Sequence, residues 1–189
     1  MKYWFSSDWH LGHFLMLKIF RQKFNTIDDM NKSILNLYSK TIKPGDHFYF
    51  LGDLGMNKKS IIEFFELYYN NNTCFYWIMG NHDYKFKSLV RRIENEYTNV
   101  HVYDMLSIRI KGQDVTLCHY PMTTWNKSHY GAWQLYGHHH LDYTGEEKKL
   151  FIPRVGKQIN VAYDMENKIY EWDDIINMMA FEKQNWDFI

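Results

Sequence analysis

Three short runs of apolar and aromatic residues constrain the fold of this chain more than any other feature. Their lengths are typical of buried strands, and they cover residues 2–7, 47–51 and 73–79. Two stretches with the apolar spacing of helices lie between them, at 26–40 and 58–69, the first behind a predicted cap at Thr26. Strands that alternate with helices in this way predict a largely parallel sheet with helices over both faces.

The pattern changes after residue 100, where helical spacing gives way to short strands and turns. The predicted elements of this second part are an antiparallel pair of strands at 100–110 and 115–119, short strands at 134–136 and 160–163, and a closing helix at 171–183. The sequence contains no internal repeat and no linker. Residues 1–189 are therefore expected to form a single α/β domain, a four-layer αββα sandwich with helices on both outer faces.

Clusters of polar residues stand directly after the predicted strands. Ligands bind outside the carboxyl ends of the strands in open α/β sheets, so these clusters should meet at one rim of the molecule. In chain order they are Asp8-x-His10, Gly52-Asp53, Gly80-Asn81-His82-Asp83, His119 and Gly137-His138-His139-His140. A glycine precedes a candidate ligand in three of them, where we expect the backbone to turn sharply off a strand.

The residue types in these clusters are those that bind divalent metal ions. Carboxylate oxygens, an amide oxygen and imidazoles together suit Mn²⁺, Fe²⁺ and Zn²⁺. Neither of the two cysteines, Cys74 and Cys118, belongs to the clusters, which argues against a structural thiolate zinc site. Seven candidate ligands are more than one tetrahedral ion needs, and a carboxylate shared by two ions would account for their number. The sequence therefore predicts a centre of two metal ions.

The order of these motifs, from Asp8 to His140, resembles that of the calcineurin-like metallophosphoesterase superfamily. Two further segments, Leu11-Gly12-His13 and Asn160-Val161-Ala162-Tyr163-Asp164, resemble the small bacterial and phage phosphoesterases of that superfamily. The resemblance implies the fold named above, a metal-dependent phosphoesterase activity, and direct hydrolysis without a covalent intermediate. It also implies two divalent transition-metal ions, for which Mn²⁺ is our expectation and Fe²⁺, Zn²⁺ and Ni²⁺ are open alternatives.

The resemblance also implies a role for each residue of the centre. The ligands of the first ion would be Asp8, His10 and His140. Those of the second would be Asn81, His119 and His138, and Asp53 would bridge the two ions. His82 would face the substrate and protonate the leaving group, while Asp83 would accept its other ring N–H and favour the imidazolium form.

For the substrate we expect a small phosphate ester, with a phosphodiester such as a nucleotide preferred over a phosphomonoester. The segment 120–136 is rich in aromatic residues, so either it packs as a surface loop or it forms a wall that stacks a base. The predicted substrate contacts are His13, Trp125 and Tyr130, with a helix start as the alternative for His13. Lysine plus arginine and aspartate plus glutamate number 22 each, and this zero net charge argues mildly against long nucleic acid without excluding it.

The main alternative function is a catalytically silent module that keeps this fold and its metal ions for interaction with another protein. The full ligand set and His82 argue against it. No apolar stretch approaches the roughly 18 residues of a membrane span, and none near the first residues has the length of a signal peptide. We therefore expect a cytoplasmic protein with no membrane partner, and we expect the charged run at 146–149 to be solvated surface.

Overall fold

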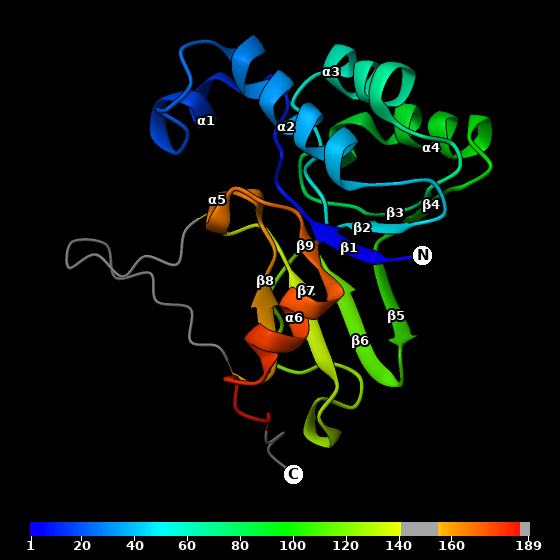
Figure 1. Cartoon of the computed structure of the whole chain (residues 1–189), viewed down its shortest axis with the longest axis vertical. Helices are drawn as coiled ribbons and strands as arrows, with labels where there is room; N and C mark the ends of the chain where they lie inside the picture. The colour runs from blue at the N-terminus through cyan, green and yellow to red at the C-terminus, as the bar shows by residue number, and fades with distance from the viewer. Residues whose placement is uncertain (141–154, 186–189) are drawn as a thin grey trace.

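Two β-sheets form the centre of the computed structural model, which describes residues 1–140 and 155–185 (Figure 1). Within these residues the first sheet has the strand order β4-β3-β2-β1-β9. Its strands are β1 (Tyr3–Ser6), β2 (His47–Phe50), β3 (Cys74–Ile78), β4 (Val100–Tyr103) and β9 (Tyr170–Glu171). The second sheet has the order β5-β6-β7-β8. Its strands are β5 (Met105–Ile110), β6 (Gln113–Cys118), β7 (Trp133–Tyr136) and β8 (Gln158–Asn160).

Strands β1 to β4 run parallel to one another, as predicted, because a helical crossover separates each from the next, whereas the edge strand β9 pairs antiparallel with β1. The helices on this side are α1 (Phe14–Ile19), α2 (Ile27–Thr41), α3 (Lys58–Glu63) with a π-helical turn at Phe64–Tyr68, and α4 (Lys87–Glu96). The expected cap of α2 is confirmed, since Asp29 N donates to Thr26 Oγ1 at 3.1 Å. Helix α4 was not predicted, although Leu89, Val90 and Ile93 mark its buried side.

Aromatic side chains fill the layer between these helices and the first sheet. Trp9, Phe48 and Phe64 are fully buried there, and the Trp9 ring lies 5.7 Å from Phe48 and 5.6 Å from Phe64 between centroids. Alternate residues of the same strands point the other way, so Phe5 and Tyr49 enter a second core between the two sheets. Both cores end at the carboxyl ends of the strands, where the polar clusters begin.

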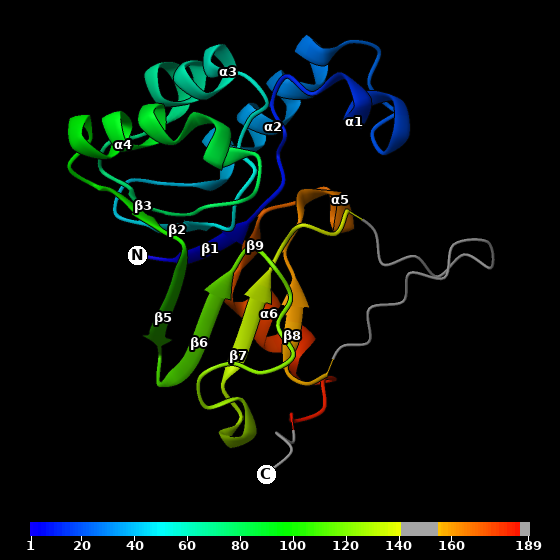
Figure 2. The ribbon, with the colours of Figure 1, turned by 180° about the vertical axis from the view of Figure 1, so that it is seen from behind.

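The helical cover of the two sheets is unequal. Helix α6 (Trp172–Met179) buries Trp172 and Met179 in the core between the sheets, and Figure 2 shows it behind β7 and β8. The outer face of the second sheet is polar, and Gln134 Oε1 accepts a hydrogen bond from Met122 N at 3.0 Å. The expected α/β sandwich is thus confirmed, with helices outside the first sheet and, within the described residues, an irregular segment against the outer face of the second.

The strand expected at 100–110 is two strands in different sheets. Strand β4 pairs with β3 and β5 pairs with β6, so the chain changes sheet at Asp104. The strand expected at 160–163 ends at Asn160, because Tyr163 begins the short helix α5 (Tyr163–Glu166). The closing helix begins at Trp172, because Glu171 pairs with β1. Hydrophobic periodicity does not reveal where a strand changes its pairing partner.

No helix within residues 1–140 and 155–185 combines the length and apolar character that crossing a bilayer requires. The charged run at 146–149 lies outside the described residues. That residues 1–189 form a single domain stays a prediction.

Candidate metal centre

The carboxyl ends of parallel strands from both sheets meet at one rim of the molecule. Asp8 follows β1, and its backbone N–H donates to Gly52 O, just after β2, at 2.9 Å. The two sheets are tied together here, because His138 N donates to Asp8 Oδ2 at 2.9 Å. In addition, His119 Nδ1 donates to Leu51 O at 2.7 Å. The strand ends predicted to carry ligands therefore converge.

The predicted ligands form two adjoining groups. In the first, His140 Nε2 lies 3.1 Å from His10 Nε2 and 3.9 Å from Asp8 Oδ1. In the second, His119 Nε2 lies 3.1 Å from Asn81 Oδ1, and the His138 ring lies 5.1 Å from the His119 ring between centroids. The members of each group are those that the sequence resemblance assigned to one ion.

Asp53 lies between the two groups. Its Oδ2 is 3.7 Å from His10 Nε2 and 3.5 Å from His119 Nε2. Ligand atoms of Asp8, Asp53 and His119 all lie within 4.8 Å of one another, as do those of Asp8, His10 and His140. A carboxylate has two oxygens and about four lone-pair directions, so Asp53 can serve both groups at once.

Four of the predicted ligands have a left-handed backbone, which residues other than glycine rarely adopt. The φ angle is 58° at Asp8, 47° at His10, 61° at Asp53 and 70° at His138. Each such residue costs on the order of 1–2 kcal/mol, and hydrogen bonds such as His10 N to Asp53 O, at 3.0 Å, hold the turns in place. Strained backbone concentrates at functional sites, and here it coincides with the candidate ligands.

Gly80 and Gly137, which precede candidate ligands, leave no room for a side chain. A Cβ on Gly80 would lie 2.2 Å from Asp53 Oδ1, and one on Gly137 would lie 2.3 Å from Asp8 Oδ2. The sharp turn expected at these positions is not the reason, because among the three glycines only Gly52 has a positive φ, of 96°. The loops at Gly80 and Gly137 therefore close directly around the two carboxylates.

The electrostatics of the centre favour a bound cation. Burial and, after it, the negative charge of Asp8 raise the pKa of Asp53 to about 8. Burial by itself would raise the pKa of Asp8 too, but the neighbouring imidazoles hold it below its usual range. Burial lowers the pKa of His10 to about 4, and that of His138 to about 4 as well. His10 and His138 are thus neutral imidazoles at pH 7, the form that binds metals, and they lie beside buried carboxylates that gain from positive charge.

An unpartnered carboxylate oxygen and a close pair of imidazole nitrogens show where a cation fits. Within the described residues, Asp8 Oδ1 is buried and has no hydrogen-bond partner. His10 Nε2 and His140 Nε2 are only 3.1 Å apart, and two imidazole lone pairs at this distance repel unless a proton or a cation lies between them. Buried polar atoms are rarely left unsatisfied. The residues present therefore fit divalent cations.

The structure corrects the role expected for Asp83. Its side chain is fully buried, and its carboxylate accepts hydrogen bonds at 2.8–3.1 Å from the N–H groups of Asp53, Leu54 and Gly80 and from Trp77 Nε1. His82 Nδ1, in contrast, is buried without a partner in the described part of the chain. The expected hydrogen bond between His82 and Asp83 is wrong, because the turn at 82–83 sends the carboxylate inward to the backbone of the ligand loops.

His82 lies beside Asp53. Its Nε2 is 3.8 Å from Asp53 Oδ2, and its side chain is 25% exposed. Its backbone N–H donates to Asp53 Oδ1 at 2.8 Å, which orients that carboxylate. Burial lowers the pKa of His82, and the positive charge of Lys85 lowers it further. The environment therefore does not favour the imidazolium form in the way expected from the sequence.

Of the three predicted substrate contacts, His13 alone lies at the centre. Its ring lies 5.4 Å from the His10 ring and 6.1 Å from the His82 ring between centroids. His13 precedes α1, but its side chain makes no capping hydrogen bond there. A helix cap therefore does not account for its position.

Trp125 and Tyr130 are not brought to the centre. Trp125 is buried, and its Nε1 donates to Ala132 O, just before β7, at 2.9 Å. Tyr130 is 79% exposed in the same segment. Because β6 and β7 are parallel, the chain between them must return along the sheet to the opposite rim (Figure 1). The expected substrate contacts of these two residues are wrong for this reason.

Tyr120 is an aromatic residue of the centre that the sequence reasoning missed. Its ring lies 5.0 Å from the His119 ring and 4.9 Å from the His138 ring between centroids. Its side chain is 42% exposed, so part of the ring is open to solvent. The sequence does contain a signal for it, because Tyr120 directly follows a candidate ligand at the end of a strand.

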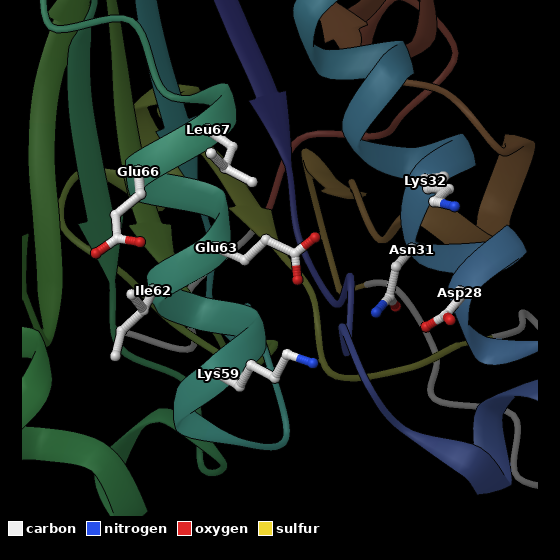
Figure 3. Close-up of a pocket in the computed structure, with 8 residues that line it drawn as sticks. All are labelled: Asp28, Asn31, Lys32, Lys59, Ile62, Glu63, Glu66 and Leu67. Atoms are coloured by element: carbon white, nitrogen blue, oxygen red, sulfur yellow. The ribbon is translucent and has the colours of Figure 1, made fainter.

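A separate pocket of about 720 Å³ lies between α2 and α3 (Figure 3). Its lining residues are Asp28, Asn31, Lys32, Lys59, Ile62, Glu63, Glu66 and Leu67. Basic and acidic side chains occur together in it, and none of the predicted metal ligands lines it. The pocket is therefore distinct from the metal centre.

Comparisons with known proteins agree with this geometry. The family model described as calcineurin-like phosphoesterase matches residues 1–178. An uncharacterized protein of Methanocaldococcus jannaschii is 30% identical over 166 residues, which is 88% of this chain and 84% of that protein. The crystal structure of a protein of unknown function from Aquifex aeolicus superposes with a TM-score of 0.67 at 21% identity, over 94% of this chain and 98% of that one. The similarity to the Aquifex aeolicus structure shows the fold alone.

Proposed function

Because the chain belongs to the calcineurin-like phosphoesterase family, we propose that it hydrolyses a small phosphodiester, such as a nucleotide, at a centre of two divalent transition-metal ions. Membership of the family makes it a phosphoesterase, a hydrolase that acts on phosphate esters. The observation that carries the two-ion centre is the position of Asp53, whose Oδ2 lies 3.7 Å from His10 Nε2 and 3.5 Å from His119 Nε2. One carboxylate between two groups of donors supports two ions rather than one.

Each group of donors is assigned one ion, and Asp53 is shared. The ligands assigned to the first ion are Asp8, His10 and His140, and those assigned to the second are Asn81, His119 and His138. When bound, a pair of such ions lowers the pKa of a water molecule and stabilises negative charge on phosphoryl oxygens. Mn²⁺ is the ion we expect, and the same oxygen and imidazole donors accept Fe²⁺, Zn²⁺ or Ni²⁺.

The residues around the ions would orient the ester and handle its protons. We assign to His82 the donation of a proton to the leaving oxygen, a role worth about 10²–10⁴-fold in rate. Because the pKa of His82 is lowered by burial, this contribution should decline as the pH rises through that pKa. Asp83 acts indirectly, since it accepts the N–H groups of Asp53 and Gly80 and so holds two ligand loops.

An exposed aromatic surface beside the second group supports a substrate with a flat group. Tyr120 is 42% exposed, and its ring lies 4.9 Å from that of His138 between centroids. Stacking a base on an aromatic side chain contributes about 1–3 kcal/mol to binding. This favours an ester that carries a base, such as a nucleotide, over one that carries none.

A substrate screen with reconstituted protein tests the proposal. The protein is stripped with a chelator, loaded with Mn²⁺ and assayed against phosphomonoesters, cyclic nucleotides and dinucleotides, with Asp53→Asn as the control for metal dependence. We expect metal-dependent cleavage of diesters. Cleavage of monoesters alone would identify a phosphomonoesterase, and full metal loading with no turnover of any ester would favour the silent interaction module. The cytoplasmic location and the bacterial or phage branch stay predictions.

A further inference from the structure

Behind the first group of ligands, Arg21 and Asp164 form a buried charged network. Arg21 is 1% exposed, and it binds the Asp164 carboxylate twice, through Nε to Oδ1 at 2.6 Å and through Nη2 to Oδ2 at 2.9 Å. The same guanidinium donates to Asp8 O at 2.6 Å and to Trp9 O at 2.5 Å. It therefore links the left-handed turn at Asp8 to a carboxylate 143 residues after Arg21 in the chain.

Asp164 in turn contacts His140. Its Oδ2 lies 2.8 Å from His140 Nδ1. Both oxygens of the Asp164 carboxylate also accept hydrogen bonds from the Arg21 guanidinium, at 2.6 and 2.9 Å, and an ionised carboxylate paired in this way only accepts. The proton of a neutral His140 is then on Nδ1. Its Nε2 presents a lone pair toward His10 Nε2, at 3.1 Å, and Asp8 Oδ1, at 3.9 Å.

The corresponding imidazole of the second group is held differently. His119 Nδ1 donates to the backbone carbonyl of Leu51 at 2.7 Å. Hydrogen bonds to a charged acceptor are stronger than those to a neutral one, so His140 is the more firmly polarised of the two. A substitution at Asp164 acts on the first group and leaves the partner of His119 in place, which provides an internal comparison.

We propose that Asp164, held by Arg21, is a positioning residue of the metal centre, which fixes the tautomer and direction of His140 so that Nε2 binds a divalent cation. The inference rests on the proposed assignment of His140 as a ligand. Partners of this kind behind a ligating histidine are typically worth 10–100-fold in metal affinity. Arg21 supplies the opposite charge and the hydrogen bonds that a buried carboxylate requires.

An amide cannot replace the carboxylate in this network. Three N–H groups converge on Asp164, two from Arg21 and one from His140. Asparagine has one acceptor oxygen and an NH₂ group. In either orientation of the amide an Arg21 N–H loses its acceptor. Where the NH₂ takes the place of Oδ2, it also faces His140 Nδ1 and favours the Nε2–H tautomer, whose Nε2 cannot bind a cation. A purely structural role would instead change stability and leave the tautomer and the metal affinity unaltered.

The tautomer of His140 can be measured without any substitution. Long-range ¹H–¹⁵N spectra of the chelated wild-type protein distinguish a proton on Nδ1 from one on Nε2. We expect His140 to carry it on Nδ1 and to shift toward Nε2 in Asp164→Asn. A wild-type His140 protonated on Nε2 would overturn the proposal.

Calorimetric titration of the chelated full chain with Mn²⁺ measures the consequence for binding. We expect Asp164→Asn to bind one of two ions about 10–100-fold more weakly and the other as before. The matched control is Asp46→Asn, because Asp46 is also buried, 4% exposed, and accepts hydrogen bonds from Trp4 Nε1 and the backbone of Lys2 and Lys43. The control should lower stability and leave both affinities unchanged. Equal weakening of both ions by Asp164→Asn, or no weakening, contradicts the proposal.

Arg21→Lys covers the case in which Asp164→Asn does not fold. Lysine keeps the positive charge but cannot donate to both oxygens of a carboxylate in the way arginine does. We therefore expect Arg21→Lys to lower the Mn²⁺ affinity several-fold for the same ion that Asp164→Asn weakens. An unchanged affinity would count against the proposal. The wild-type titration separates this inference from the proposed function. Fewer than two ions in the wild type contradicts the two-ion centre, whereas two ions without a selective loss in the variants contradicts the role of Asp164 alone.

Discussion

Replacing Asp53 by a residue that cannot ionise should stabilise the protein once its metal ions have been stripped away. Asp53 is 2% exposed, and burial together with the charge of Asp8 raises its pKa from 3.8 to about 8. Between these two pH values the folded chelated protein holds a proton that the unfolded chain has released. The contribution of Asp53 to stability is therefore fully present below about pH 4 and is lost as the pH rises toward 8.

The size of the effect follows from the width of that window. Each pH unit within this window changes the free energy of unfolding by about 1.4 kcal/mol. Between pH 4 and pH 7 the chelated wild type therefore loses about 4 kcal/mol of stability through this one group. Asp53→Asn keeps the shape of the side chain and an acceptor for His82 N, but it cannot ionise. The chelated variant should gain about 4 kcal/mol on the wild type over this range, on the order of 10 °C in melting temperature.

Urea and thermal unfolding of EDTA-treated protein at several pH values between 4 and 8 measure this difference. Glu66→Gln, which makes the same chemical change at an exposed position after α3, is the matched control and should show no comparable pH dependence. Saturating Mn²⁺ should reverse the order, because the wild type is then stabilised by binding. A difference between Asp53→Asn and wild type that is the same at pH 4 and pH 7 would refute the reasoning.

Three further outcomes are expected. Elemental analysis of Mn²⁺-saturated protein should find about two ions per chain, and a value that never exceeds one contradicts the two-ion centre. His82→Ala should keep its metal ions but lose about 10²–10⁴-fold in turnover of alkyl or ribose esters and less for nitrophenyl esters; equal slowing of all esters rules out the proton-donor role. Tyr120→Ala should raise the KM for nucleotide diesters by about 5–150-fold, because about 1–3 kcal/mol of stacking is lost. The exposed control Tyr130→Ala should leave the KM unchanged. An equal change of KM in the two variants would show that Tyr120 makes no substrate contact.

Residues whose position depends on their neighbours in the chain could be predicted from the sequence. Asp8 and Asp53 each follow a short apolar run, and parallel strands bring their carboxyl ends to the same edge. His119 could be placed in the same way, from the end of a hairpin strand. The meeting of these side chains is thus a consequence of strand order, which the alternation of strands and helices already indicates.

Predictions failed where proximity in the chain was taken for proximity in space. Asp83 adjoins His82 in sequence, but its carboxylate turns inward to Trp77 and to backbone N–H groups. Trp125 lies between two ligand strands in sequence, but the crossover between parallel strands carries it to the opposite rim. The run 100–110 looks continuous, but its two halves pair with strands of different sheets.

The sequence by itself determined the parallel sheet, the strand ends that carry chemistry, and the residue types that suit divalent metal ions. Only the tertiary structure decided which partner each of those side chains has. Arg21 and Asp164 are separated by 143 positions, and no local pattern marks either of them as a support for His140. The physical reason is that strands and turns arise from interactions along the chain, whereas a hydrogen bond requires two groups within about 3 Å, a condition that the packing of distant segments alone can satisfy.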